Sequence, residues 1–121
     1  MSAGSILIID DEIDLMELFK MALRRLPYDI LTAKDGLTAL DLLKTEIPKL
    51  IVLDIAMPKM SGLELLHQVR ADPRFEKTKI MILTAVPNRM SQQDENIADA
   101  VLPKPITLKG LEEAVNDLIG S

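Results

Sequence analysis

Residues Ile6–Glu12 read ILIIDDE, which is four consecutive aliphatic side chains followed at once by three acidic ones. A short, continuous apolar run of this kind is typical of a strand that is buried on both faces of a sheet. The same form returns at Leu50–Asp54 (LIVLD) and at Ile80–Thr84 (IMILT). The sequence therefore predicts three buried strands, each with a polar residue directly after its last aliphatic one.

Helical patterns separate these runs. Apolar residues recur at the helical spacings of three and four in four stretches of the chain. These stretches are residues 15–26, 37–43, 63–69 and 108–118. Two weaker strands are predicted at Tyr28–Ala33 and Ala100–Leu102. Only a faint helical pattern occupies Val86–Ala98, so we expect the fourth helix to be short or irregular.

Five strands that alternate with helices indicate βαβ units, a parallel sheet and helices on both of its faces. The predicted fold class is therefore α/β, with a three-layer, doubly wound architecture and a five-stranded parallel sheet. A length of 121 residues without a linker or low-complexity tract predicts a single domain over residues 1–121. In this architecture, ligands bind at the carboxyl ends of the strands, near the point where the strand order reverses.

Composition excludes several classes of function. The chain has no cysteine, which rules out a disulfide framework, a zinc–thiolate site and thiol catalysis, and which fits a cytoplasmic protein. Its formal net charge is −5, so we expect no binding of nucleic acid through phosphate neutralisation. The longest aliphatic runs have four residues, so neither a membrane span nor a signal-peptide core is predicted.

Four of the predicted strands deliver a polar or charged residue to the same edge of the sheet. These residues are Asp10 and Asp11, then Asp54, Thr84 and Lys104. If the strands are neighbours, the three carboxylates converge and repel one another unless a cation lies between them. A hard divalent cation prefers oxygen ligands, and Mg²⁺ suits a site with few carboxylates and spare positions for water.

Such a site is suited to phosphoryl chemistry. Mg²⁺ beside Lys104 could bind phosphoryl oxygens, which leaves Asp54 as the carboxylate that attacks phosphorus. Helix capping by Asp11 or Glu12 is the alternative explanation for two of the acids. It explains Asp54 poorly, because the next helix is predicted to start near Gly62, and it does not explain the lysine.

Four segments of the chain together resemble the receiver domain of bacterial response regulators. They are Ile6–Glu12 (ILIIDDE), Ile51–Gly62 (IVLDIAMPKMSG), Ile82–Ala85 (ILTA) and Leu102–Ile106 (LPKPI), in order along essentially the whole chain. The resemblance implies a flavodoxin-like (βα)5 fold, as in chemotaxis regulators. It also implies a switch, not an enzyme acting on other substrates. In that switch a histidine kinase or a phosphotransfer protein donates a phosphoryl group to an aspartate, and a downstream protein or a fused output domain responds.

The resemblance assigns a role to each residue of the predicted site. Asp54 matches the phosphoacceptor, which is also a metal ligand. Asp11 matches the carboxylate that ligates Mg²⁺ directly, and Asp10 matches the one that acts through water. Ala56 matches a residue whose backbone carbonyl is a further ligand. Lys104 matches the lysine that pairs with the phosphoryl oxygens.

The resemblance also predicts a conformational switch, and here the chain departs from the family. Thr84 matches the hydroxyl that moves toward the phosphoryl group on activation, and the Lys104–Pro105 bond matches one that is usually cis. Val101 stands where receivers commonly carry a tyrosine or phenylalanine whose ring swings inward. Because valine is short and stiff at χ1, we expect activation to order or shift the backbone of Val86–Ala98 instead.

Three alternatives share this chemistry or this fold. A phosphohydrolase of the haloacid-dehalogenase type carries a second aspartate two residues after its nucleophile, where this chain has Ala56, and needs a cap domain. A flavodoxin-type FMN binder has a Ser/Thr-rich phosphate loop where this chain has the acidic residues 10–12. A pseudo-receiver that docks without phosphorylation usually lacks the acceptor, an acidic partner or the lysine, and all are present here. His67 is expected to be a solvated side chain, not a phosphorelay group.

Overall fold

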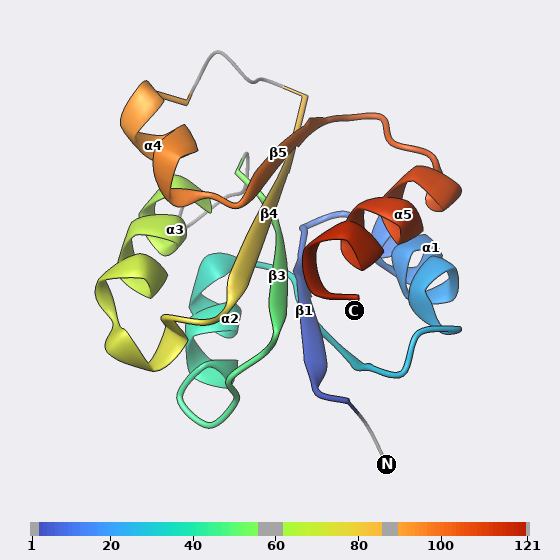
Figure 1. The fold of residues 1–121 in the computed structure, drawn as a ribbon, viewed down its shortest axis with the longest axis horizontal. Helices are drawn as coiled ribbons and strands as arrows, with labels where there is room; N and C mark the ends of the chain where they lie inside the picture. The colour runs from blue at the N-terminus through green and yellow to red at the C-terminus, as the bar shows by residue number, and fades with distance from the viewer. Residues whose placement is uncertain (1–2, 56–61, 86–89, 121) are drawn as a thin grey trace.

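Five parallel strands form one sheet in the order β2-β1-β3-β4-β5 (Figure 1). The computed structural model describes residues 3–55, 62–85 and 90–120 of the chain. The strands are β1 (Ser5–Ile9), β2 (Asp29–Ala33), β3 (Leu50–Asp54), β4 (Lys79–Thr84) and β5 (Ala100–Pro103). The predicted α/β fold class and parallel sheet are therefore confirmed, and the strand order reverses between β1 and β3.

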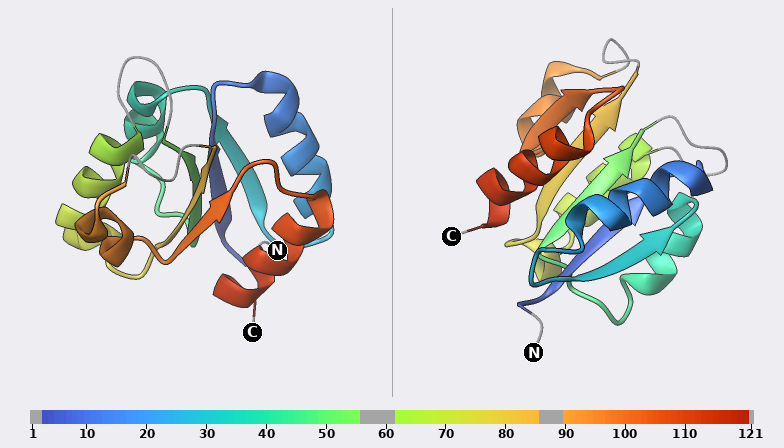
Figure 2. Two further views of the ribbon diagram at one scale, coloured as in Figure 1. Left: turned by 90° about the horizontal axis from the view of Figure 1, so that it is seen from above. Right: turned by 90° about the vertical axis from the view of Figure 1, so that its right-hand side faces the viewer.

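Helices cover both faces of the sheet, so the fold has the three layers that the alternation predicts. Helices α1 and α5 pack together on one face, and α2, α3 and α4 lie on the other (Figure 2). The helices are α1 (Ile13–Leu23), α2 (Gly36–Leu42), α3 (Gly62–Ala71), the 3-10 turn η1 (Pro73–Phe75), α4 (Gln92–Ile97) and α5 (Leu108–Ile119). Within the described parts of the chain, no helix combines the length and the apolar character that crossing a membrane requires.

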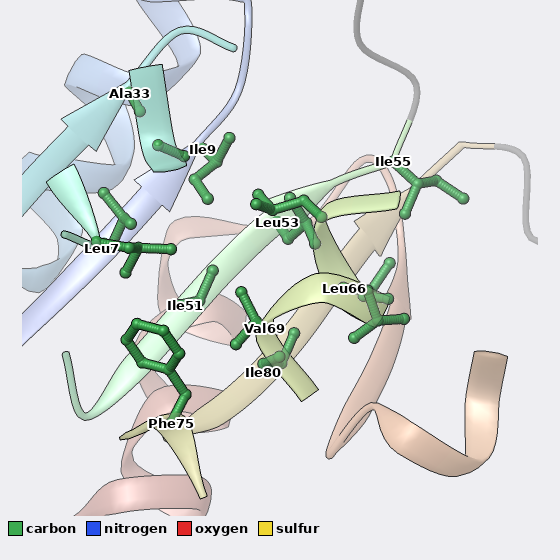
Figure 3. Packing of buried hydrophobic residues seen from close by; sticks show 14 residues of the cluster. Leu7, Ile9, Ala33, Ile51, Leu53, Ile55, Leu66, Val69, Phe75 and Ile80 are labelled. Carbon is green, nitrogen blue, oxygen red and sulfur yellow. The ribbon is translucent and has the colours of Figure 1, made fainter. Parts of the chain in front are cut away.

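The two faces of the sheet bury two separate clusters of side chains, because successive residues of a strand point to opposite faces. Leu7 of β1 contributes to the cluster under α2 and α3, whereas the adjacent Ile8 contributes to the cluster under α1 and α5. Figure 3 shows the first cluster, in which Val69 of α3 and Phe75 of η1 approach Ile51 of β3. Continuous aliphatic runs are therefore the pattern that this architecture requires.

Central and edge strands of the sheet differ in how much of their length is buried, and this difference explains why the sequence pattern of the central strands is the clearer one. The central strands β1, β3 and β4 are buried along almost their whole length. The edge strands β2 and β5 have a neighbour on one side only, and most of their residues are half-buried or exposed. Their sequences therefore include polar residues and prolines that a central strand would not tolerate.

The fourth helix is short, as predicted. α4 has six residues and begins with a capping box in which Ser91 and Asp94 each accept a hydrogen bond from the other's backbone N–H. Such a box satisfies two of the backbone donors that a helix N-terminus leaves unpaired. Part of the expectation for Val86–Ala98 concerns residues 86–89, which lie outside the described residues.

Gly62 begins α3 and lies against the backbone of β3. A Cβ atom on Gly62 would be 2.5 Å from the carbonyl oxygen of Asp54 and 2.5 Å from the Cα of Ile55. The Gly62 N–H also donates to the carbonyl of Ile55 at 3.2 Å. The absence of a side chain therefore lets α3 start directly against the end of β3.

We expect Gly62→Ala to lower the free energy of unfolding by about 1–3 kcal/mol, because rigid backbone must move to admit the methyl group. Denaturant unfolding measures this difference. Gly110→Ala, in the first turn of α5, is the matched control. Its new methyl group would lie 2.8 Å from the Thr107 hydroxyl and weaken the cap that this hydroxyl provides to α5. The higher helix propensity of alanine, about 1 kcal/mol, should offset that loss, so the free energy of unfolding should change little. A Gly62→Ala protein as stable as the wild type would contradict the packing argument.

Candidate functional site

The register of the strands brings the predicted site residues to one edge of the sheet. Ile9 pairs with Leu53, so Asp10 and Asp54 follow at adjoining positions of β1 and β3. Asp54 pairs with Leu83, which precedes Thr84. Pro103 pairs with Thr84, and Lys104 comes next. The groups are thus contributed by four neighbouring strands at the point where the strand order reverses. These groups are Asp10, Asp11, Asp54, Thr84 and Lys104.

Three carboxylates form an acidic cluster at this edge. One carboxylate oxygen from each of Asp10, Asp11 and Asp54 lies within 4.8 Å of the other two. Asp10 and Asp54 are buried, and Asp11 is exposed. The backbone N–H of Glu12 donates to Asp10 Oδ1 at 3.0 Å. The convergence predicted from the strand ends is therefore present in the structure.

Helix capping does not account for this arrangement. Glu12 occupies the N-cap position of α1, but its side chain makes no capping hydrogen bond. Asp54 is followed by a helix that begins only at Gly62, as predicted. Capping of α1 by the Glu12 side chain is therefore not what places this acid here.

Lys104 places a cation against two of the carboxylates. Its Nζ donates to Asp10 Oδ2 at 2.8 Å and lies 3.5 Å from Asp54 Oδ2, and the lysine side chain is 14% exposed. The Lys104 backbone N–H donates to the carbonyl of Thr84 at 2.9 Å. The Lys104–Pro105 peptide bond is cis, as the resemblance predicts.

Opposing effects act on the Lys104 ammonium. Burial disfavours its charged form and would lower its pKa, but the hydrogen bond and the charge of Asp10, with the charges of Asp54 and Glu12, outweigh burial and raise the pKa above its ordinary value. Lys104 is therefore a cation throughout the neutral range. That charge remains available at the edge of the acidic cluster.

The remaining predicted residues lie around this cluster or outside the described residues. Thr84 is fully buried at the end of β4. Val101 pairs with Ile82 of β4 and is half-buried against the cluster under α2 and α3. Ala56, predicted to offer a backbone carbonyl, lies outside the described residues.

The donor set fits Mg²⁺. It consists of carboxylate oxygens, which hard cations prefer, and nitrogen or sulfur ligands are not part of it. Asp10 is already engaged by Lys104 and by the Glu12 N–H, whereas Asp11 is exposed. A hydrated ion could therefore approach from the solvent side and keep several of its waters, as Mg²⁺ usually does.

Sequence reasoning missed two polar contacts away from this edge. His67 was expected to be solvated, but its Nε2 lies 2.6 Å from Asp94 Oδ1, although the side chain is 46% exposed. Arg70, one turn later, pairs with Asp99. The Ser91–Asp94 spacing is that of a capping box and could have located the start of α4, but no local pattern shows that Asp94 also meets a histidine.

Comparison with known proteins identifies the family. A family model described as "Response regulator receiver domain" matches residues 6–116. "Response regulator MprA" from Mycobacterium sp. (strain KMS) is 37% identical over 109 residues, which are 88% of this chain and 46% of that protein. The chain spans about half of the length of the first curated relatives that it matches.

Solved structures agree with this match. The chemotaxis response regulator CheY4 of Vibrio cholerae has a TM-score of 0.86 at 26% identity, over 96% of this chain and 98% of that one. Response regulator protein TrrA from Thermotoga maritima, solved in complex with Mg²⁺–BeF, has a TM-score of 0.84 at 34% identity, over 96% and 99%. The doubly wound α/β fold is thus shared with response regulators. The chain belongs to the response regulator receiver domain family of two-component systems.

We expect Asp10→Asn to lower the pKa of Lys104, because the variant removes the charge that raises this pKa most and leaves the burial that lowers it. A side-chain NMR titration of Lys104 measures the change. In the wild type, the stability supplied by the charged lysine is complete below its ordinary pKa of about 10.4. It is lost as the pH rises through the raised value.

Glu12→Gln is the control, because Glu12 acts on Lys104 through a weaker charge interaction than Asp10 does. Its effect on the titration midpoint should be smaller than that of Asp10→Asn. Equal midpoints in the wild type and in Asp10→Asn would show that the contact between Asp10 and Lys104 does not control the charge of the lysine.

Proposed function

We propose that this chain is a phosphoacceptor receiver and that Asp54 accepts a phosphoryl group from a histidine kinase or a phosphotransfer protein. The observation that carries the proposal is the position of Asp54. Its buried carboxylate lies 3.5 Å from a lysine ammonium and within a cluster of three acids, at the switch point of a doubly wound sheet. The family supports this assignment, because the matched region includes every one of these residues.

In the proposed reaction a carboxylate oxygen of Asp54 attacks phosphorus in line with the bond to the donor. A P–O bond forms to Asp54 as the P–N bond of phosphohistidine breaks, and the bonding pair goes to the imidazole nitrogen. The Lys104 ammonium stabilises the negative charge on the transferred oxygens, because it is already directed at this edge by Asp10. When bound, Mg²⁺ neutralises further charge on the phosphoryl group.

The two remaining acids would hold the ion in different ways. Asp11 is exposed and is the proposed direct ligand, with Asp54. Asp10 is buried, accepts from Glu12 and pairs with Lys104, which supports the proposed contact through water. The backbone carbonyl of Ala56 is kept as a proposed further ligand on the basis of the resemblance alone.

The proposed output is a change of protein-binding surface. Thr84 would move its hydroxyl toward the phosphoryl oxygens, and the backbone near α4 would shift in response, because Val101 is too short to act as a swinging ring. We propose that residues 1–121 form one receiver domain in the cytoplasm. Its response would pass to a separate protein or to an output domain fused to it, without direct binding of nucleic acid by this domain.

Wild-type protein incubated with acetyl phosphate and Mg²⁺ should gain one phosphate, because Asp54 has the charge environment that transfer requires. Asp54→Ala should gain none. Intact mass spectrometry distinguishes the two outcomes. Omitting Mg²⁺ should abolish labelling of the wild type. Equal labelling of Asp54→Ala would sink the assignment, and an unlabelled wild type would favour a docking domain that works without phosphorylation.

Asp11→Ala should weaken Mg²⁺ binding far more than Asp10→Ala, because a direct ligand contributes more than one that acts through water. An NMR titration of each variant with Mg²⁺ compares the affinities. Lys104→Ala should bind Mg²⁺ at least as well as the wild type, because a nearby cation has been removed. Comparable losses in the two aspartate variants would mean that their roles are assigned in the wrong order.

A further inference from the structure

Helix α4 depends on contacts outside itself. It has six residues, and isolated helices shorter than about 12–15 residues are marginal in water. α3 is its main neighbour, and the two helices lie side by side (Figure 1). Two polar side chains of α3, His67 and Arg70, reach α4 from the same face of that helix, since residues three apart are neighbours on a helix surface. They hold opposite ends of α4.

The first contact holds the N-terminal end. His67 Nε2 lies 2.6 Å from Asp94 Oδ1, while Asp94 Oδ2 accepts from the backbone N–H of Ser91 at 2.9 Å. The hydrogen bond from Ser91, followed by that of His67, holds the pKa of Asp94 below its usual range. This carboxylate therefore closes the capping box with one oxygen and joins α4 to α3 with the other. We call the His67–Asp94 contact the latch.

The second contact holds the C-terminal end and is more extensive. Arg70 Nε donates to the carbonyl of Ile97 at 2.7 Å, and Arg70 Nη1 donates to the carbonyl of Thr78 at 2.8 Å. Arg70 Nη2 pairs with Asp99. Asp99 is itself tied to β4, because the Ile80 N–H donates to its carboxylate and its own N–H donates to the Ile80 carbonyl, both at 2.8 Å. We call this the anchor.

The two ends of α4 are therefore held unequally. The Arg70 side chain is 20% exposed and donates to four separate acceptors, the longest of these bonds being 3.4 Å to the Phe75 carbonyl. The His67 side chain is 46% exposed and has one bond to α4, to Asp94, whose side chain is 12% exposed. A single side-chain hydrogen bond that is partly open to water is broken more easily than several bonds to separate acceptors. Rupture of the latch is consequently the easier event, and the anchor keeps the far end of the helix in place.

We propose that α4 is a strap hinged at Arg70 and Asp99 and closed by the His67–Asp94 latch, so that its N-terminal end opens first. Helix α3 can stay in place while α4 moves, because Gly62 packs the start of α3 against the backbone of Asp54 and Ile55. Asp94 is the acid in contact with the His67 imidazole.

Amide hydrogen exchange measured by NMR tests the strap without any phosphorylation. His67→Ala should speed exchange at Glu95, whose N–H donates to the Ser91 carbonyl at the N-terminal end of α4, by roughly two- to fivefold, which corresponds to the loss of one partly exposed hydrogen bond. Exchange at Ile80 and Asp99 should not change, because the anchor remains. Gln92→Ala is the matched control. It removes the exposed hydrogen bond to Asn96, which lies within α4 and does not reach α3, so its effect on α4 should be smaller.

Three outcomes would overturn the proposal. Unchanged exchange in α4 of His67→Ala would mean that the contact does not close the strap. Equal acceleration at Ile80 and Asp99 would mean that the segment unfolds as a unit, without a hinge. A Gln92→Ala effect as large as that of His67→Ala would mean that α4 responds to any lost side-chain bond. Urea unfolding of each variant verifies that global stability does not explain the result.

A second arm links the strap to activation, and it rests on the proposed function. Mg²⁺ and beryllofluoride should bring exchange of wild-type α4 toward the His67→Ala value and add little to that variant. If Mg²⁺ and beryllofluoride speed the exchange of α4 in His67→Ala as much as they do in the wild type, activation does not act through the latch. Binding of beryllofluoride is read separately by ¹⁹F NMR. A protein that fails to bind it contradicts the phosphoacceptor role, and the first arm still decides the strap.

Discussion

The register of a parallel sheet buried on both faces is the constraint on which the rest of this molecule depends. Buried strands must satisfy every backbone N–H and C=O through their neighbours, so the strands cannot slide by a residue without exposing aliphatic side chains and losing bonds. Parallel strands also end at the same edge. The identity of the residue after Ile9, after Leu53 and after Leu83 therefore fixes the chemistry of that edge.

The cost of burying carboxylates at this edge depends on the positive charge that lies beside them. Asp10 is 2% exposed and Asp54 is 6% exposed, and a buried carboxylate without a partner costs several kcal/mol. Lys104 reduces that cost because its ammonium contacts both side chains. Asp11, which is exposed, needs no such partner. Among the described residues, Lys104 is the cation that contacts this cluster of three carboxylates, so these four side chains carry net negative charge. Such a cluster attracts a divalent cation, and in the proposed function the lysine still provides positive charge for a phosphoryl group.

The elements that sequence reasoning located well are those whose burial is total. β1, β3 and β4 have no polar residue in their interiors, and the acids that follow them converge as the strand-end argument requires. The sequence predicts that a helix starts near Gly62, but the steric reason for a glycine there is revealed only by the packing of α3 against β3. The His67–Asp94 contact joins residues 27 positions apart. Periodicity specifies which face of a helix is buried, but not which polar side chains meet at its margin.

The valine at position 101 and the short helix α4 both affect how a change at the end of β4 would reach the surface. Val101 is half-buried beside Ile82 of β4, and its side chain has a single, restricted rotation. In the proposed switch, movement of Thr84 at the end of β4 would therefore not be passed on by a rotamer change at Val101. It would be passed on through the backbone. In the proposed strap, a six-residue helix held at one end by several bonds of Arg70 and at the other by the single His67–Asp94 contact opens at the weaker end first. The polar margin of α3 would then determine which part of the surface responds.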